Sequence, residues 1–365
     1  MKFKYSLLLL LATFATGIMH ANATNADTLF AQNLTSYGRS LLNNNNELEL
    51  ISSAVHFGAS FTGVTCKIYV SLPDKSAHSY LQYELDGVYQ KRIRIEGKST
   101  NPIIITAPVG GNHKIWIFKC TEATSGAIRI NKLAAVNIKP IKPSKAPLIE
   151  FIGNSITCGA AADDSEIPCG TGDYIDHHNA YLAYGPRLAR TLGANYILSS
   201  VSGIGVYRNW NSDGPTMPQI YENTELKWDS PLKWDFSKYS PKVVSIALGT
   251  NDFSNGDGVK PRMPFDPEKF IASYINFVKL VKSKYPKARV ALLSSPMVKL
   301  KNGKVLEDCI TAVKNKINAD YPGDKPAEVF FFPPMEAHGC GGHPSVEDHA
   351  IMAEQATSFF KTLLN

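Results

Sequence analysis

Three residues in this chain stand where a polar side chain could take part in acyl transfer. Ser155 lies within Gly-Asn-Ser-Ile-Thr-Cys-Gly, shortly after the apolar run Pro147-Leu148-Ile149, so a short strand is expected to run into a tight turn that carries it. Asn251 ends a second apolar strand within Gly-Thr-Asn-Asp, and His343 stands before Pro344 and a predicted helix. A hydroxyl, an amide and an imidazole can serve as nucleophile, oxyanion donor and general base.

Each candidate also has an ordinary structural interpretation. Ser155 could cap a helix, and Asn251 could be a turn asparagine that bonds its own backbone. Thr157 occupies the place of the second glycine of a nucleophile elbow, so the sequence lacks that motif. Gly203, at the end of another predicted strand, would let a substrate approach its N–H, or could be a turn glycine. His343 could be a histidine of a surface loop.

Two further groups of residues could bind ligands. One lies within six residues near the C-terminus and comprises His338, Cys340 and His343. This spacing fits no standard zinc site, so we expect no metal and no cofactor. The other group lies in a long connection of the kind that often forms binding loops, and its aromatic faces would suit sugar rings, with loop packing as the alternative. Its members are Trp210, Trp228 and Trp234.

The elements that must position these residues change character along the chain. Residues 30–138 show short strands rich in β-branched and aromatic residues, which is typical of a β-sandwich or jelly roll. The expected strands there are 65–72, 79–85, 90–95, 102–107, 113–120 and 127–138. From residue 148 onward, apolar strands alternate with helical patterns, which predicts a parallel sheet with helices on both faces. The strands are 148–152, 195–200, 243–248, 289–293 and 328–332, and the helices are 179–192, 267–284, 304–318 and 345–364.

Five such strands suit a flavodoxin-like order, in which the site lies at the carboxyl ends of the strands. We therefore divide the chain into a signal peptide (1–23), a β domain (24–138), a proline-rich linker (139–147) and an α/β domain (148–365). The signal peptide has two lysines, a leucine run and the small-x-small cleavage site Ala21-Asn22-Ala23. These features predict a secreted or periplasmic protein, and no later stretch is long and apolar enough to span a membrane.

Charge and cysteine content narrow the partners and the compartment. The net charge of +6 falls to +4 without the two lysines of the signal peptide, and the basic residues do not cluster with aromatics, so nucleic acid is not an expected partner. The even number of cysteines, six, in an exported chain favours disulfides. We expect a Cys66–Cys120 bond. The remaining four allow three pairings, and they are Cys158, Cys169, Cys309 and Cys340.

The order of the motifs resembles that of the SGNH (GDSL-like) hydrolases. Gly153-Asn154-Ser155, Gly203, Gly249-Thr250-Asn251-Asp252 and His343-Pro344 follow one another as they do in that family. An N-terminal β domain with Phe-Gly-Ala-Ser-Phe at 57–61 precedes them. This arrangement resembles carbohydrate esterase family 2, a family of bacterial acetyl esterases of plant cell-wall polysaccharides.

The resemblance implies a jelly-roll domain followed by an SGNH domain and a serine esterase without a cofactor. Ser155 would be the nucleophile and His343 the base, and the oxyanion hole would combine the N–H groups of Ser155 and Gly203 with the Asn251 side chain. Independently of the resemblance, the aromatic faces of the three tryptophans would suit contact with the substrate. Substrates would be acetylated polysaccharides or oligosaccharides, with acetyl groups on xylan, mannan or glucomannan, often at the 6-position.

The sequence departs from the SGNH pattern in two places. Asn154 replaces the usual aspartate before the serine, and Gly341 and Cys340 occupy the positions where an aspartate usually precedes His343. The resemblance therefore implies a Ser-His dyad whose ring is oriented by a main-chain carbonyl or by a distant acid such as Glu336. The alternatives are an SGNH lipase or lysophospholipase, and a non-catalytic carbohydrate-binding protein.

Overall fold

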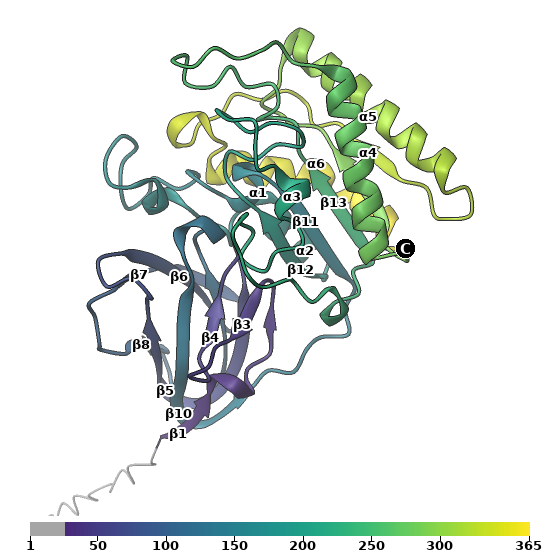
Figure 1. The fold of residues 1–365 in the computed structure, drawn as a ribbon. Helices are drawn as coiled ribbons and strands as arrows, with labels where there is room; N and C mark the ends of the chain where they lie inside the picture. The colour runs from purple at the N-terminus through teal and green to yellow at the C-terminus, as the bar shows by residue number, and fades with distance from the viewer. Residues whose placement is uncertain (1–25) are drawn as a thin grey trace, which may run out of the picture.

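The computed structural model describes residues 26–365, and the predicted signal peptide lies outside the described residues. An antiparallel β domain is followed by an α/β domain built on a parallel sheet, and the two lie against each other (Figure 1). The predicted fold class is therefore confirmed. None of the helices within residues 26–365 has the length and apolar character of a membrane-spanning segment.

The β domain contains one sheet of ten strands. Seven of them follow the order β3-β4-β10-β5-β9-β6-β7, while β1 pairs with β10, and β2 and β8 pair with β5. Its strands are β1 (Asp27–Phe30), β2 (Ser36–Tyr37), β3 (Ser40–Leu42), β4 (Leu48–Leu50), β5 (His56–Ser71), β6 (His78–Leu85), β7 (Val88–Glu96), β8 (Ile103–Thr106), β9 (Asn112–Lys119) and β10 (Ile128–Pro140). The sequence did not predict β1 to β4, because these short segments lack the run of β-branched residues that marks β8.

The strand β5 is twice as long as the predicted strand 65–72. Its first half pairs with β9 and its second half pairs with β8. Gly63, with φ +95°, lies between the two halves and lets the strand bend. Gly58 and Gly63 also interrupt the run of β-branched residues, which is why the sequence indicated only the second half.

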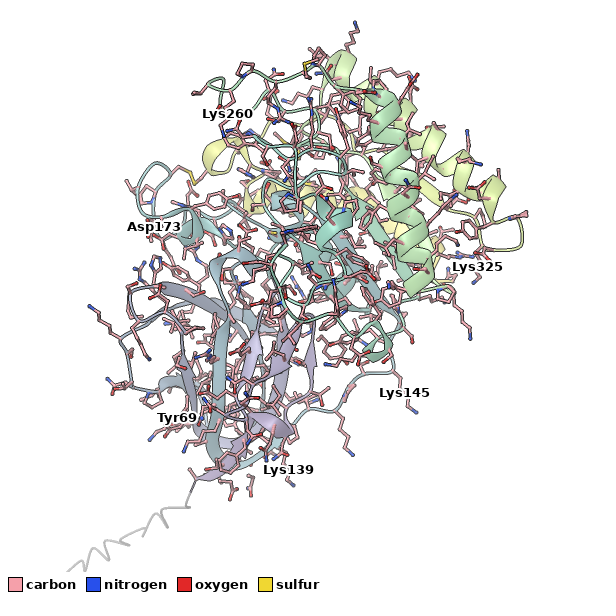
Figure 2. The ribbon with its side chains drawn as sticks, viewed as in Figure 1. Tyr69, Lys139, Lys145, Asp173, Lys260 and Lys325 are labelled. Carbon is pink, nitrogen blue, oxygen red and sulfur yellow. A yellow bond between two sulfur atoms is a disulfide. The ribbon has the colours of Figure 1, made fainter. Side chains whose placement is uncertain are left out.

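The connection between the domains runs along the outside of the molecule, past Lys139 and Lys145 in Figure 2. β10 continues through Lys139 and Pro140, which lie opposite Ser60 and Ala59 of β5. The next strand begins at Leu148. Residues 141–147 therefore form the irregular part of this connection.

The parallel sheet has the order β12-β11-β13-β14-β15, which is the predicted flavodoxin-like order. Its strands are β11 (Leu148–Gly153), β12 (Asn195–Ser200), β13 (Val243–Ala247), β14 (Arg289–Leu293) and β15 (Glu328–Phe330). Gly153 at the end of β11 lies opposite Ser200 of β12 and Ala247 of β13. The three strands that carry the site candidates therefore end side by side.

Helices cover both faces of this sheet, as predicted (Figure 1). α2 (Tyr184–Thr191) and α6 (Val346–Leu364) pack on one face, and α4 (Pro267–Lys284) and α5 (Leu300–Asp320) pack on the other. Two short helices, α1 (Ser155–Cys158) and α3 (Met217–Ile220), lie in connections. α2 begins later than the predicted residue 179. The N–H groups of Ala180 and Tyr181 are used instead for hydrogen bonds to the β domain, where they meet the Cys120 oxygen and the Gln82 side chain.

The cysteines correct one prediction. Cys66 and Cys120 are both free and buried, so the expected bond between them is wrong. The register explains this: Phe118 lies opposite His56 of β5, whereas Cys66 lies ten residues farther along that strand, opposite Ile105. The disulfide of the described chain joins Cys169 and Cys340, one of the combinations that the sequence left open.

Candidate active site

Ser155 lies on a tight turn at the carboxyl end of β11. Asn154 caps the short helix α1, and its Oδ1 accepts a hydrogen bond from the Ile156 N–H at 3.0 Å, so the capping role falls to Asn154 and not to Ser155. The turn is closely packed, since a Cβ on Gly153 would lie 2.0 Å from Thr157 Oγ1. This packing holds the Ser155 hydroxyl in place at the edge of the sheet.

His343 comes from the loop before α6 and meets Ser155. Its Nε2 lies 3.0 Å from Ser155 Oγ, and its Nδ1 lies 3.2 Å from the main-chain oxygen of Cys340. Because a carbonyl oxygen can only accept, this contact places a proton on Nδ1 and leaves Nε2 free to accept the serine proton. Burial lowers the pKa of His343, and the bond to Cys340 opposes this shift. The neutral, proton-accepting imidazole is therefore favoured.

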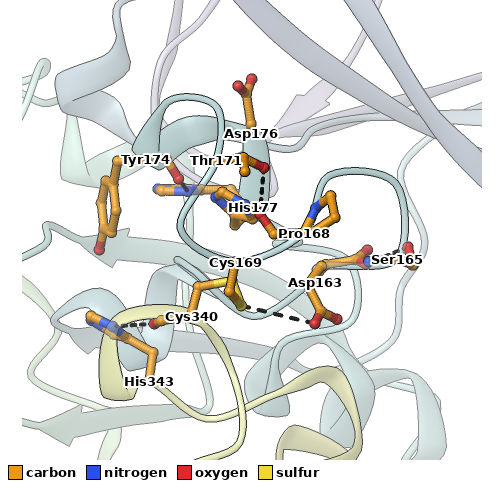
Figure 3. Close-up of a disulfide and its surroundings, with 12 residues drawn as sticks. Asp163, Ser165, Pro168, Cys169, Thr171, Tyr174, Asp176, His177, Cys340 and His343 are labelled. Carbon is orange, nitrogen blue, oxygen red and sulfur yellow. Dashed lines mark hydrogen bonds between the residues drawn. A yellow bond between two sulfur atoms is a disulfide. The ribbon is translucent and has the colours of Figure 1, made fainter.

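The main-chain oxygen of Cys340, and not the distant acid Glu336, lies against His343 Nδ1. Glu336 is exposed and forms an ion pair with Lys299. The Cys340 carbonyl is held by the disulfide, which ties the loop of His343 to the loop that carries Tyr174 (Figure 3). The imidazole orientation thus depends on the contact between two loops.

The oxyanion-donor candidates converge on the same edge of the sheet. The N–H of Ser155, the first residue of α1, has no partner within the helix. Gly203 follows β12 with φ +74°, a conformation that favours glycine, and its oxygen accepts a hydrogen bond from the Trp210 N–H at 2.7 Å. Asn251 follows β13 and uses one amide hydrogen to bond the Ile204 oxygen at 2.8 Å, which leaves the other for a ligand.

Known families match this chain in two consecutive parts. The model described as Carbohydrate esterase 2 N-terminal matches residues 36–143, and the GDSL-like Lipase/Acylhydrolase family model matches residues 151–325. The structure of a family two carbohydrate esterase from Clostridium thermocellum in complex with cellohexaose is 27% identical, with a TM-score of 0.78, over 93% of this chain and 99% of that one. The chain is therefore similar to family two carbohydrate esterases over nearly its whole length.

Two curated relatives differ in how much of their own length this chain spans. The Cellulase/esterase CelE of Acetivibrio thermocellus is 30% identical over 78% of this chain, but the match spans only 34% of CelE. An acetylxylan esterase / glucomannan deacetylase of Cellvibrio japonicus is 28% identical over 82% of this chain and 81% of its own length. The chain thus spans about a third of one relative and most of the other.

A pocket of about 370 Å³ opens beside Gly203. Trp210 and Trp228 line it and are 48% and 63% exposed, so both can meet a ligand. Trp234 is 5% exposed, and its ring lies 5.1 Å from the Arg39 guanidinium. Of the three predicted tryptophans, the structure brings two to the pocket and gives Trp234 a packing role.

The histidines not assigned to chemistry occupy ordered positions. His177 Nε2 lies 3.2 Å from the Pro168 oxygen, and His349 is buried and accepts from the Tyr184 N–H. The suggested metal ligands His338, Cys340 and His343 do not act together, because the Cys340 sulfur is in the disulfide and His338 Nδ1 contacts Asp348 at 2.9 Å.

Sequence reasoning missed three residues around the site. Asp252 is buried and accepts the N–H groups of Val206 and Tyr207, which holds the loop after Gly203, and burial raises its pKa to about 6. Asp252 directly follows Asn251, so the motif Gly-Thr-Asn-Asp already contained this residue. Tyr174 and Glu122 reach the site from distant segments and had no such signal.

Proposed function

We propose that this chain is an exported carbohydrate O-acetylesterase that removes acetyl groups from plant cell-wall polysaccharide, such as xylan, mannan or glucomannan. The observation that carries the proposal is the 3.0 Å contact between His343 Nε2 and Ser155 Oγ, at the edge where the oxyanion donors converge. The relative from Cellvibrio japonicus is named for deacetylation of xylan and glucomannan, which supports this substrate class.

In the first half of the reaction, the Ser155 oxygen attacks the acetyl carbonyl while His343 Nε2 takes its proton. The carbonyl oxygen becomes negatively charged and is stabilised by the N–H groups of Ser155 and Gly203 and by the Asn251 amide. His343 then gives the proton to the sugar oxygen as the carbon–oxygen bond breaks. The acetyl group remains on Ser155, and the deacetylated sugar leaves.

In the second half, water attacks the acetyl-enzyme. His343 takes a proton from the water, the same donors stabilise the second oxyanion, and the protonated His343 returns a proton to Ser155 Oγ as acetate leaves. His343 thus passes the Ser155 proton to the sugar oxygen and a proton of the water to Ser155 Oγ, so the enzyme ends as it began. The Cys340 carbonyl orients the ring throughout.

The pocket beside Gly203 would hold the sugar. Aromatic faces pack against the apolar faces of sugar rings, and Trp210 and Trp228 offer two such faces at the pocket wall. An acetyl group reaching Ser155 from a sugar in this pocket would place its carbonyl oxygen among the donors.

The test is acetate release from a panel of acetylated xylan, mannan and glucomannan by the native protein and by Ser155→Ala. We expect release by the native protein and none by the folded variant, while the exposed Ser237→Ala control keeps full activity. Near-normal turnover by folded Ser155→Ala would refute the nucleophile. Activity that rises with acyl length would identify a lipase, and polysaccharide affinity without turnover would identify a binding protein.

A further inference from the structure

The segment that follows β9 reaches from the β domain to the candidate active site. Lys119 Nζ donates to the main-chain oxygens of Thr121 and Glu122, at 3.0 and 2.6 Å, and the Ala180 N–H of the other domain donates to the Cys120 oxygen. The backbone of this segment is therefore fixed from both domains. Glu122 at its end is 3% exposed.

The Glu122 carboxylate contacts the turn that carries Gly203. Its Oε2 accepts a hydrogen bond from the Ser202 N–H at 2.6 Å. It also lies 3.6 Å from the sulfur of Cys158, which belongs to the short helix that begins at Ser155. A hydrogen bond to an ionised acceptor is about twice as strong as a neutral one, so this contact restrains the turn more than an ordinary backbone bond would.

The rest of the turn is held as well. The Ser202 hydroxyl lies 3.2 Å from the Tyr174 hydroxyl, and the Gly203 oxygen accepts from the Trp210 N–H. Among residues 26–365, no acceptor is hydrogen-bonded to the Gly203 N–H. Three restraints therefore surround one peptide N–H that is left free for a ligand.

We propose that Glu122 is a positioning residue, contributed by the β domain, that holds the Ser202–Gly203 turn so that the Gly203 N–H points at the oxyanion. The inference rests on the acyl-transfer function proposed above. It also gives the β domain a part in the reaction, since the α/β domain alone lacks this acceptor. The misplacement of a catalytic group by about 1 Å can lower a rate about a hundredfold.

The other oxygen of the Glu122 carboxylate faces the imidazole of His178. His178 is fully buried, its Nδ1 lies 3.0 Å from the Tyr174 oxygen, and its Nε2 lies 3.6 Å from Glu122 Oε1. Burial is the largest influence on the pKa of His343 and lowers it, whereas the nearby Glu122 carboxylate raises it. His178 therefore lies against one carboxylate oxygen of Glu122, while the other oxygen holds the turn.

The experiment compares Glu122→Met with Glu122→Gln, using 4-nitrophenyl acetate as a substrate without a sugar. Methionine keeps most of the buried volume and removes the acceptor, whereas glutamine keeps an oxygen that can accept from the Ser202 N–H. We expect Glu122→Met to lower kcat about 10- to 100-fold with KM within about threefold, and Glu122→Gln to recover most of the lost kcat.

Glu84→Met is the matched control. Glu84 also accepts a hydrogen bond across the domain boundary, from the Tyr181 hydroxyl at 2.8 Å, but it does not contact the turn. We expect it to change the melting temperature and to leave kcat within about twofold. Circular dichroism confirms the fold of each variant, and Glu122→Ala replaces Glu122→Met if the latter does not fold.

Two outcomes would overturn the proposal. One is a folded Glu122→Met protein with native kcat, and the other is a folded Glu122→Gln protein as impaired as Glu122→Met, which would show that the charge matters and not the hydrogen bond. Both outcomes can be distinguished from failure of the proposed function. In that case the native protein would release no acetate, or Ser155→Ala would retain activity, whatever the Glu122 variants do.

Discussion

At the scale of single residues, the proposed dyad works with a carbonyl where a serine hydrolase usually has a carboxylate. The Cys340 oxygen fixes the His343 ring, but a carbonyl stabilises an imidazolium less than a carboxylate does. Burial acts in the same direction, because it disfavours the charged ring. The base is therefore expected to stay neutral to a lower pH than an ordinary histidine.

The dependence of kcat/KM on pH tests this. Because the neutral ring is the active form and its pKa is lowered from 6.5, activity should rise with pH and reach its plateau with a midpoint below 6.5. The measurement is kcat/KM for 4-nitrophenyl acetate from about pH 4.5 to 8. A midpoint above 6.5 would mean that a negative group near His343 outweighs its burial.

Asn251→Ala should lower kcat by about two to three orders of magnitude, the usual effect of losing one oxyanion donor. Asn318→Ala is a suitable control, because that amide also bonds backbone groups, at Ala327, but lies near the end of α5. It should affect stability alone. A change in KM without a change in kcat would assign Asn251 to substrate binding.

At the scale of elements, the site is built from strand ends and one cross-linked pair of loops. β11, β12 and β13 deliver the serine, the glycine and the asparagine by register, whereas His343 comes from a loop. That loop is joined to the loop after α1 by the Cys169–Cys340 bond, over a sequence separation of 171 (Figure 3). The loop thus gains through a covalent bond the restraint that strands gain through pairing.

Cys169→Ser should lower kcat by up to about a hundredfold while the protein remains folded at room temperature, because the Cys340 carbonyl loses its support. The melting temperature should also fall, since the bond closes a long loop. Cys309→Ser, which alters a free buried cysteine, is the control and should keep kcat. Unchanged activity after confirmed loss of the bond would remove the bracing role.

At the scale of the whole molecule, the two domains share buried polar contacts. Arg39 of the β domain is 1% exposed and donates to the Ser199 hydroxyl at 3.1 Å, which in turn donates to Glu150 at 2.6 Å. Its other nitrogens donate to the backbone oxygens of Tyr221 and Asn223. Because these contacts cross the domain boundary, unfolding of either domain is expected to destabilise the other.

Arg39→Met should lower the free energy of unfolding by about 3–5 kcal/mol, because it leaves the Ser199 hydroxyl and the oxygens of Tyr221 and Asn223 buried without their donor. Arg129→Met is the control: Arg129 pairs with Glu49 at the surface of the β domain and should cost less than about 1 kcal/mol. Urea unfolding measures both. Equal losses would show that the shared interface contributes no more than an ordinary surface pair.

The sequence by itself determined the fold class, the strand order and the placement of the candidate residues at strand ends. Periodicity and turn residues are local properties, and they were sufficient for the five strands that carry or flank Ser155, Gly203 and Asn251. The lack of an acid before His343 was also readable, because it depends on neighbours in the chain.

Tertiary structure alone decided the partners that come from distant segments. The Cys169–Cys340 pairing, the burial of Trp234 and the approach of Glu122 to Ser202 all join residues far apart in the sequence. Such contacts depend on loop paths and on how two domains pack, and neither leaves a periodic pattern. The expected Cys66–Cys120 bond was wrong for the same reason, since the register of β5 separates two residues that share a domain.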